Sequence, residues 1–306
     1  MIVRWGLGEL AAVLEEVSIA SPLLITTARW ASHDLPVADR FAGAQPHAGL
    51  QGVHAAVAVA DGHDGLVAIG GGSAIDTAKA VSAATGLALV AIPTTYGGAE
   101  WTRYFGNHDS ASGVKVAGTG SDTRAIVYEP ELTLDLPWAE SCGTAMNALA
   151  HCTEGLLFGE CDDSWIGARL IDEWLPRVNA NPHDLEARRN LLRGAEHSGR
   201  ALATMGMGVG HAMAQALGGR YLLPHGAMNA ICLPPAMRFN GVDEPLSVDR
   251  AEELAVLGGF QRLRDFGVPR SELDLVSAAA AERGPAKANP RHVTPEAIAT
   301  LLLSVW

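Results

Sequence analysis

The stretch GLVAIGGGSAIDTAKAVSAATGLALVAIPTT, residues 65–95, decides the fold. Two apolar runs, 65–72 and 87–95, are rich in β-forming residues and end in glycines or in hydroxyl-bearing residues. Between them, residues 73–85 repeat apolar side chains at helical spacing. A strand, a glycine turn, a helix and a second strand form a βαβ unit. Such a unit predicts a parallel sheet, because the helix carries the chain back to the edge where the first strand began.

The same pattern continues on both sides of this unit. Residues 22–27 and 124–130 are further β-rich runs, which predict two more strands. After about Pro137 the β pattern fades, and the segment ESCGTAMNALAHCTEGLLF predicts a helix that begins near a capping Ser141. Helical periodicity predicts further helices at 163–178, 184–204, 226–239, 248–266, 271–283 and 294–305. We therefore predict an α/β domain over residues 1–138 and an all-helical domain over residues 139–306.

The composition argues against several classes of protein. The 306 residues carry a net charge of −12 and contain no long basic run, which disfavours a nucleic-acid partner. The N-terminus lacks the pattern of a signal peptide, and the longest uncharged stretches are interrupted by turn residues, which disfavours a membrane span. Four cysteines without a C-x-x-C pair indicate reduced thiols. We expect a cytoplasmic protein that acts on a small molecule.

The glycine turn between the first strand and the helix of the βαβ unit suits a phosphate group. Gly70, Gly71 and Gly72 let backbone N–H groups approach a ligand closely, and the helix that begins at Ser73 offers unpaired donors. A pyrophosphate fits these donors, although the usual G-x-G-x-x-G pattern is absent. The alternative is a turn in which the glycines serve only the backbone geometry.

A second polar turn follows the next strand. The segment AIPTTYGGAEWT, residues 91–102, places Thr94 and Thr95 directly after an apolar run and two glycines after them. In a parallel sheet, ligands bind in the crevice outside the carboxyl ends of the strands. The two turns together therefore favour a ligand site at that edge. The alternative is a surface loop with threonine caps.

Four motifs together resemble a known family. GGGSAIDTAKA, IPTTYGGAE, NALAHCTEG and HAMAQALGGRYLLPHG occur in the order that is typical of the iron-containing (group III) alcohol dehydrogenase superfamily. The segments PTTYGGAEWT, VYEPELTLDLP and NALAHC are most similar to its maleylacetate reductase branch. The resemblance extends over nearly the whole chain. It implies a dinucleotide-binding α/β domain followed by a helical domain, and we expect a homodimer.

The resemblance also implies which residues hold NAD(H) or NADP(H). Gly71, Gly72 and Ser73 would hold the pyrophosphate, and Lys115 would contact a ribose hydroxyl. The walls on the adenosine and nicotinamide sides would be formed by Thr94, Thr95 and Thr102. Members that prefer NAD commonly carry Asp where this chain has Thr27. Without that carboxylate, the site would tolerate the 2′-phosphate of NADPH as well as NADH.

The resemblance further implies a set of metal-ligand positions, at which this chain departs from the metal-dependent members. Those members carry an Asp, a His four residues later and two more His, whereas this chain has Asn147, His151, His211 and His225. Without the carboxylate, no ligand at these positions would balance the charge of a divalent iron or zinc ion. The maleylacetate reductase branch similarly carries Asn at the first of these positions. We expect catalysis without a metal. A metal on the three histidines stays open as the alternative, because imidazole suits both zinc and iron.

A second departure concerns proton delivery. Gln215 stands where many members carry a His near the nicotinamide, and glutamine does not titrate near neutrality. A proton would then have to come from one of the three histidines, from Tyr221 or from water. Arg103, after the threonine turn, is a candidate partner for a substrate carboxylate, and the alternative is a solvated surface arginine.

These observations predict an NAD(P)H-dependent reductase that resembles maleylacetate reductase. It would transfer hydride to a small oxygenated anion, with His211 and His225 stabilising the oxyanion or donating the proton. The alternatives are a metal-dependent alcohol or aldehyde dehydrogenase, a lyase similar to dehydroquinate synthase, and a protein that binds a dinucleotide without turnover.

Overall fold

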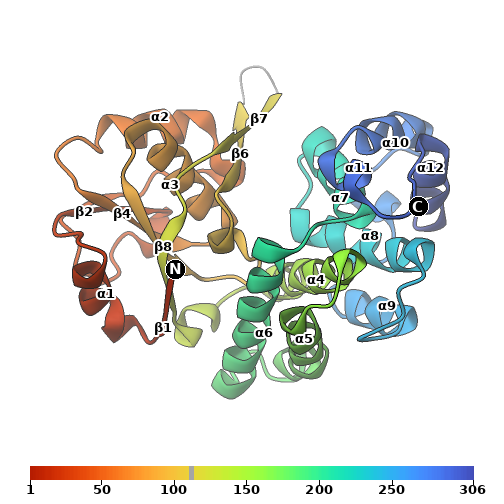
Figure 1. Ribbon diagram of the computed structural model, residues 1–306, viewed down its shortest axis with the longest axis horizontal. Coiled ribbons are helices and arrows are strands. Elements are labelled where there is room, and N and C mark those ends of the chain that lie inside the picture. Colours follow the sequence, from red (N-terminus) through yellow and green to blue (C-terminus); the bar gives the residue numbers. More distant parts are fainter. Residues whose placement is uncertain (110–113) are drawn as a thin grey trace. The chain divides into compact units, whose positions relative to one another are not determined.

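The computed structural model describes residues 1–109 and 114–306, and describes side chains outside residues 108–117. The chain divides into two compact units, Met1–Thr133 and Leu134–Trp306. Figure 1 shows strands gathered in the first unit and helices alone in the second. In the described residues, no helix has the length and apolar character needed to cross a bilayer.

The first unit is built on a six-stranded sheet in the order β1-β8-β5-β4-β2-β3. All neighbouring strands in it are parallel. Its strands are β1 (Ile2–Trp5), β2 (Pro22–Thr26), β3 (Asp39–Phe41), β4 (Gly65–Gly70), β5 (Ala88–Pro93) and β8 (Thr123–Tyr128). A separate antiparallel hairpin, β6 (Tyr104–Asp109) with β7 (Val114–Thr119), projects from this unit. The predicted α/β class with a parallel sheet is confirmed.

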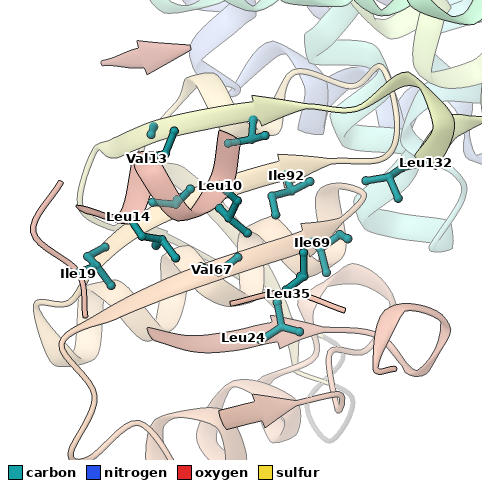
Figure 2. Packing of buried hydrophobic residues seen from close by; sticks show 13 residues of the cluster. Leu10, Val13, Leu14, Ile19, Leu24, Leu35, Val67, Ile69, Ile92 and Leu132 are labelled. Carbon is teal, nitrogen blue, oxygen red and sulfur yellow. The ribbon is translucent and has the colours of Figure 1, made fainter. Parts of the chain in front are cut away.

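Alternation along the strands creates two separate apolar layers, because successive side chains point to opposite faces. On one face, Leu24, Val67 and Ile69 pack against helix α1 (Leu10–Glu16), as Figure 2 shows. On the other face, the intervening residues pack against α2 (Leu50–Ala58) and α3 (Gly72–Thr85). Both faces are covered, so the inner strands are apolar throughout, and this explains why their sequence is a continuous apolar run.

The sequence did not predict the two edge strands of this sheet, β1 and β3. β1 is only partly buried, and the three residues of β3 include an exposed Asp39 and Arg40. An edge strand has a sheet neighbour on one side only, so it needs no long apolar run. The strand that carries Thr27 at its end is therefore the second of the chain, because β1 precedes it.

The second unit is entirely helical in its described residues. Its α-helices are α4 (Trp138–Gly155), α5 (Asp162–Ala180), α6 (Leu185–Thr204), α7 (Val209–Tyr221), α8 (His225–Asn240), α9 (Val248–Leu257), α10 (Leu273–Ala281), α11 (Gly284–Ala288) and α12 (Pro295–Ser304). Two predicted boundaries are wrong. Ser141 does not cap α4, which begins three residues earlier, and its buried hydroxyl instead donates to the carbonyl of Leu136. The predicted helix 248–266 ends at Leu257, because Gly259 adopts a positive φ of 78°.

A buried arginine fastens the start of the second unit. Arg188 on α6 is fully buried, and its guanidinium donates to the Ser141 hydroxyl at 2.7 Å and to the Pro182 carbonyl at 2.9 Å. It also reaches the carbonyls of Leu134 and Leu136 at 3.4 Å. These bonds hold the segment before α4 against α6, and so they fix where α4 begins.

Helices α4 and α8 approach each other unusually closely at two glycines. A Cβ atom on Gly226 would lie 2.5 Å from the carbonyl carbon and oxygen of Gly143. Real Cβ atoms do not come this close to backbone atoms, so the crossing requires glycine at position 226. Asn147 lies one helical turn after Gly143, and Asn229 lies one turn after His225. The glycine crossing therefore sets these polar side chains next to one another.

Candidate active site

The glycine turn lies at the carboxyl end of β4. Gly70 has a φ of 146°, which favours glycine, and Gly71 is extended and precedes the first residue of α3. No side chain caps the start of α3 at this position. The first N–H groups of α3 are therefore the donors that a phosphate could take up. Ser73, in the first turn, accepts a hydrogen bond from the backbone N–H of His47 at 3.1 Å.

The threonine turn lies beside the glycine turn, because β5 is the neighbour of β4. The N–H of Thr94 donates to the carbonyl of Gly70 at 3.0 Å, and Thr94 is buried. A Cβ on Gly71 would lie 2.9 Å from Cγ2 of Thr95. Thr27 directly follows β2, the other neighbour of β4, so it lies at the same edge of the sheet. The structure thus places four predicted residues at the carboxyl ends of three neighbouring strands: Gly71, Thr94, Thr95 and Thr27.

Other predicted cofactor and substrate residues lie elsewhere. Thr102 lines a cavity at the amino ends of the strands, together with the first residues of β1, β5 and β8. The hydroxyl of Thr102 lies 3.5 Å from Nζ of Lys79. Arg103 is exposed and lies 4.0 Å from the carboxylate of Asp122. Lys115 belongs to β7, but its side chain falls outside the described residues.

Three predicted histidines from three helices form a cluster. His151 of α4 and His211 of α7 stack with ring centroids 4.7 Å apart, and the ring of His225 of α8 lies 6.1 Å from that of His211. His151 and His211 are buried, whereas His225 is exposed. Burial, followed by the charges of the other two histidines, lowers the pKa of His151 well below its ordinary value, so this ring is neutral at physiological pH.

A carboxylate that the sequence analysis missed holds the middle ring of the cluster. Oε2 of Glu154 lies 2.5 Å from Nδ1 of His211, and both side chains are almost fully buried. Glu154 is the eighth residue of the motif NALAHCTEG and lies three residues after His151 on α4. Its place in that motif is the only signal that could have drawn attention to it.

An amide that the sequence analysis also missed joins two predicted site residues. Asn229 Nδ2 donates to Oδ1 of Asn147 at 2.6 Å and to Nε2 of His225 at 3.0 Å. Asn229 is almost fully buried. An amide nitrogen only donates, so Nε2 of His225 is the acceptor and carries no proton in this arrangement.

Two further predicted residues have different surroundings. Gln215 lies one helical turn after His211 on α7 and is partly exposed, so it shares the helix face of that histidine. Tyr221, the last residue of α7, donates its hydroxyl to Glu272 at 3.0 Å. Arg220 pairs with the same carboxylate. Tyr221 therefore belongs to a partly exposed ionic cluster at the end of α7.

Family models match most of the chain. The iron-containing alcohol dehydrogenase model matches residues 6–127, and the C-terminal model of the Fe-containing alcohol dehydrogenase family matches residues 141–259. The chain belongs to this family. The maleylacetate reductase of Pseudomonas knackmussii is 32% identical and covers 98% of this chain and 93% of its own length. That of Burkholderia cepacia is 35% identical over 79% of this chain and 73% of its own length.

A solved structure agrees with these relatives. The maleylacetate reductase of Agrobacterium tumefaciens is 27% identical, with a TM-score of 0.88 over 100% of this chain and 95% of that one. The predicted resemblance to the maleylacetate reductase branch of the iron-containing alcohol dehydrogenase superfamily is confirmed. The protein is an oxidoreductase of this family.

The name of the family implies a metal, but the side chains at these positions do not fit a divalent ion. Asn147 offers an amide in place of a carboxylate, and its oxygen already accepts a short hydrogen bond from Asn229. The side-chain amide of Asn229 also donates a hydrogen bond to Nε2 of His225. The carboxylate of Glu154 faces Nδ1 of His211 and backbone N–H groups. Two of the four donors are thus engaged, and these four positions supply no anionic ligand to balance the charge of an ion.

Replacing Gly71 with valine is expected to weaken dinucleotide binding by at least about tenfold, because its branched side chain would cover the N–H groups at the start of α3. The new Cβ would also push against the side chain of Thr95, which can yield by rotation, so the melting temperature should change little. Fluorescence titration with NADH and NADPH measures the affinity. A folded variant that binds both nucleotides as tightly as the parent would contradict the assignment of the turn.

Proposed function

We propose that this oxidoreductase reduces an activated carbon–carbon double bond in a small dicarboxylate, with NADH or NADPH as the hydride donor and without a catalytic metal. The observation that carries the proposal is the state of the histidine cluster. Its Asn147 is bonded to Asn229 and offers no carboxylate, while His211 is held by Glu154. Maleylacetate reductases are the relatives that share about a third of its residues, and their name gives the substrate class.

The edge of the parallel sheet supports a dinucleotide as cofactor. The N–H groups before and within the first turn of α3 suit a pyrophosphate, and Thr94 and Thr95 lie directly beside them. Thr27 leaves the ribose end of the site without the carboxylate that would repel a 2′-phosphate. This combination supports use of both NADH and NADPH.

The reaction that we propose places a negative charge on oxygen. Hydride adds to the alkene carbon farther from the ketone, the electron pair of the double bond moves toward the ketone, and an enolate forms. A proton then adds to the other alkene carbon and restores the ketone. The protein must therefore orient the substrate, stabilise the enolate oxygen and supply one proton.

The histidine cluster supports the last two of these tasks. Nε2 of His211 is buried and has no hydrogen-bond partner among the described residues, which supports it as an atom that a bound substrate engages. His225 is exposed at the first residue of α8 and offers a second imidazole beside it. Gln215, on the same face of α7 as His211, can donate or accept a hydrogen bond but cannot supply the proton.

The test is turnover in the presence of chelators. The purified protein is treated exhaustively with a chelator and its metal content is measured. NADH and NADPH oxidation is then followed with maleylacetate and, separately, with short aldehydes. We expect turnover with the unsaturated dicarboxylate to survive chelation. Two outcomes would contradict the proposal and favour a metal-dependent alcohol dehydrogenase. One is a metal bound at one ion per chain whose removal abolishes turnover. The other is a bound metal that supports the reduction of aldehydes only. Nucleotide binding without any turnover would favour a non-catalytic role.

A further inference from the structure

We infer that Glu154 is a positioning residue, which fixes the orientation and the tautomer of His211 so that Nε2 is the atom that exchanges a proton with the substrate. The inference rests on the proposed function for the identity of the substrate. Its geometric basis is independent of that function, because it concerns only how α4 and α7 hold one imidazole ring.

Glu154 is itself held rigidly. One carboxylate oxygen accepts from the N–H of Gly210 at 2.7 Å and lies 3.4 Å from that of His211. The other accepts from the N–H of Gly208 at 2.9 Å and pairs with Nδ1 of His211 at 2.5 Å. The N-terminal turn of α7 thus binds the carboxylate with its unpaired donors, and the negative charge lies at the positive end of the helix dipole.

This arrangement determines which nitrogen of His211 carries the proton. An ionised carboxylate only accepts hydrogen bonds, so Nδ1 must donate and Nε2 of the neutral ring must carry the lone pair. The ring cannot rotate without breaking this bond, because the side chain is buried and the carboxylate is anchored by backbone groups. Nε2 is left as the nitrogen of this ring that is buried without a partner among the described residues.

The other two histidines are held differently. His151 Nδ1 lies 3.4 Å from the hydroxyl of Ser198, a neutral group that already donates to the carbonyl of Ala148. His225 accepts from the amide of Asn229 at Nε2, as described above. The carboxylate partner therefore distinguishes His211 from His151. Because the ring is held through Nδ1, Nε2 is the nitrogen of His211 that is left to meet the substrate.

The variant Glu154→Gln separates the two roles of the carboxylate. An amide has nearly the same shape but only one accepting oxygen, so it cannot serve both the N–H of Gly210 and the pair of donors formed by the N–H of Gly208 and Nδ1 of His211. With the oxygen on the α7 cap, its N–H₂ group faces Nδ1 and favours the Nε2–H tautomer. We expect kcat to fall about tenfold, while the dissociation constant of NADH and the KM of the substrate stay unchanged.

Asn289→Ala is the matched control. The side-chain oxygen of Asn289 accepts from the N–H of Val209 at 3.1 Å, so it also holds the N-terminus of α7 but does not bond the His211 ring. This variant should lower the melting temperature and leave both the tautomer and kcat unchanged.

The tautomer is measured directly by nitrogen NMR of histidine-labelled protein, which does not depend on activity. The Nδ1–H form of His211 in the parent and its loss in Glu154→Gln support the inference. An Nε2–H form in the parent, an unchanged tautomer together with an unchanged kcat in Glu154→Gln, or an equal fall of kcat in Asn289→Ala would overturn it. If the parent shows the Nδ1–H form but no reductase turnover, the proposed function fails and the positioning of His211 by Glu154 stands.

Discussion

Replacing His211 with alanine is expected to reduce turnover about a hundredfold, because it removes the imidazole whose Nε2 meets the substrate, and the loss of one such preorganised group costs roughly 3 kcal/mol in the transition state. The residue has the features that this role requires. Its ring is almost fully buried, Glu154 fixes it through Nδ1, and its Nε2 has no partner among the described residues. Cofactor affinity should stay unchanged, because the glycine turn belongs to the other compact unit.

The steady-state kcat with saturating NADH and maleylacetate measures this effect. His225→Ala is expected to lose a similar factor, on the order of a hundredfold, because it removes the second imidazole beside the same site. His197→Ala is the control: His197 bonds Asp163 near the surface of α5 and α6, and its loss should leave turnover unchanged. Full activity with both His211 and His225 replaced would reduce the cluster to a structural element.

Replacing Gly226 with alanine is expected to lower the free energy of unfolding by about 3 kcal/mol, at the upper end of the cost of overpacking. The added methyl group would lie 2.5 Å from the Gly143 carbonyl and 3.0 Å from the N–H of Thr144. These are backbone atoms, so no side chain can rotate to relieve the contact. Helices α4 and α8 would have to separate, and Asn147 would move away from Asn229 and His225.

Denaturant unfolding measures the stability, and Gly219→Ala on α7 serves as the matched control. At that position the nearest atom to the new methyl group is the flexible end of Arg283, at 3.4 Å. Alanine is also a better helix former than glycine, so this control should be neutral or slightly stabilising. If Gly226→Ala were as stable as the parent and kept full activity, the close crossing of α4 and α8 would not be required.

The sheet and its central helix follow from local sequence patterns. The runs that became β4 and β5 are apolar throughout because both of their faces are covered, and the segment between them became α3 within one residue of the prediction. β1 and β3 were missed for the opposite reason. They are short and partly exposed at the edges of the sheet, so their pairing with β8 and β2 gives no periodic signal.

Motifs pointed to single residues of the candidate site but not to their partners. The positions of His151, His211 and His225 came from the resemblance to the family, and the structure shows their rings together. Glu154 and Asn229 received no role, although each makes the contacts that decide what a histidine can do. Thr102, in contrast, belongs to a motif that we assigned to the cofactor site. It lies at the amino ends of the strands, whereas Gly71 lies at their carboxyl ends.

The sequence by itself determined the strand–turn–helix order, the helical second half and the absence of a carboxylate at Asn147. These properties depend on residues within a few positions of each other, and such patterns reflect local backbone preference and burial. Only the tertiary structure decided the hydrogen bonds that join Asn147 to Asn229 and Glu154 to His211, over 82 and 57 residues of chain. Such contacts depend on how closely helices pack. At the crossing of α4 and α8, that distance is set by the missing side chains of Gly143 and Gly226, which no local pattern records.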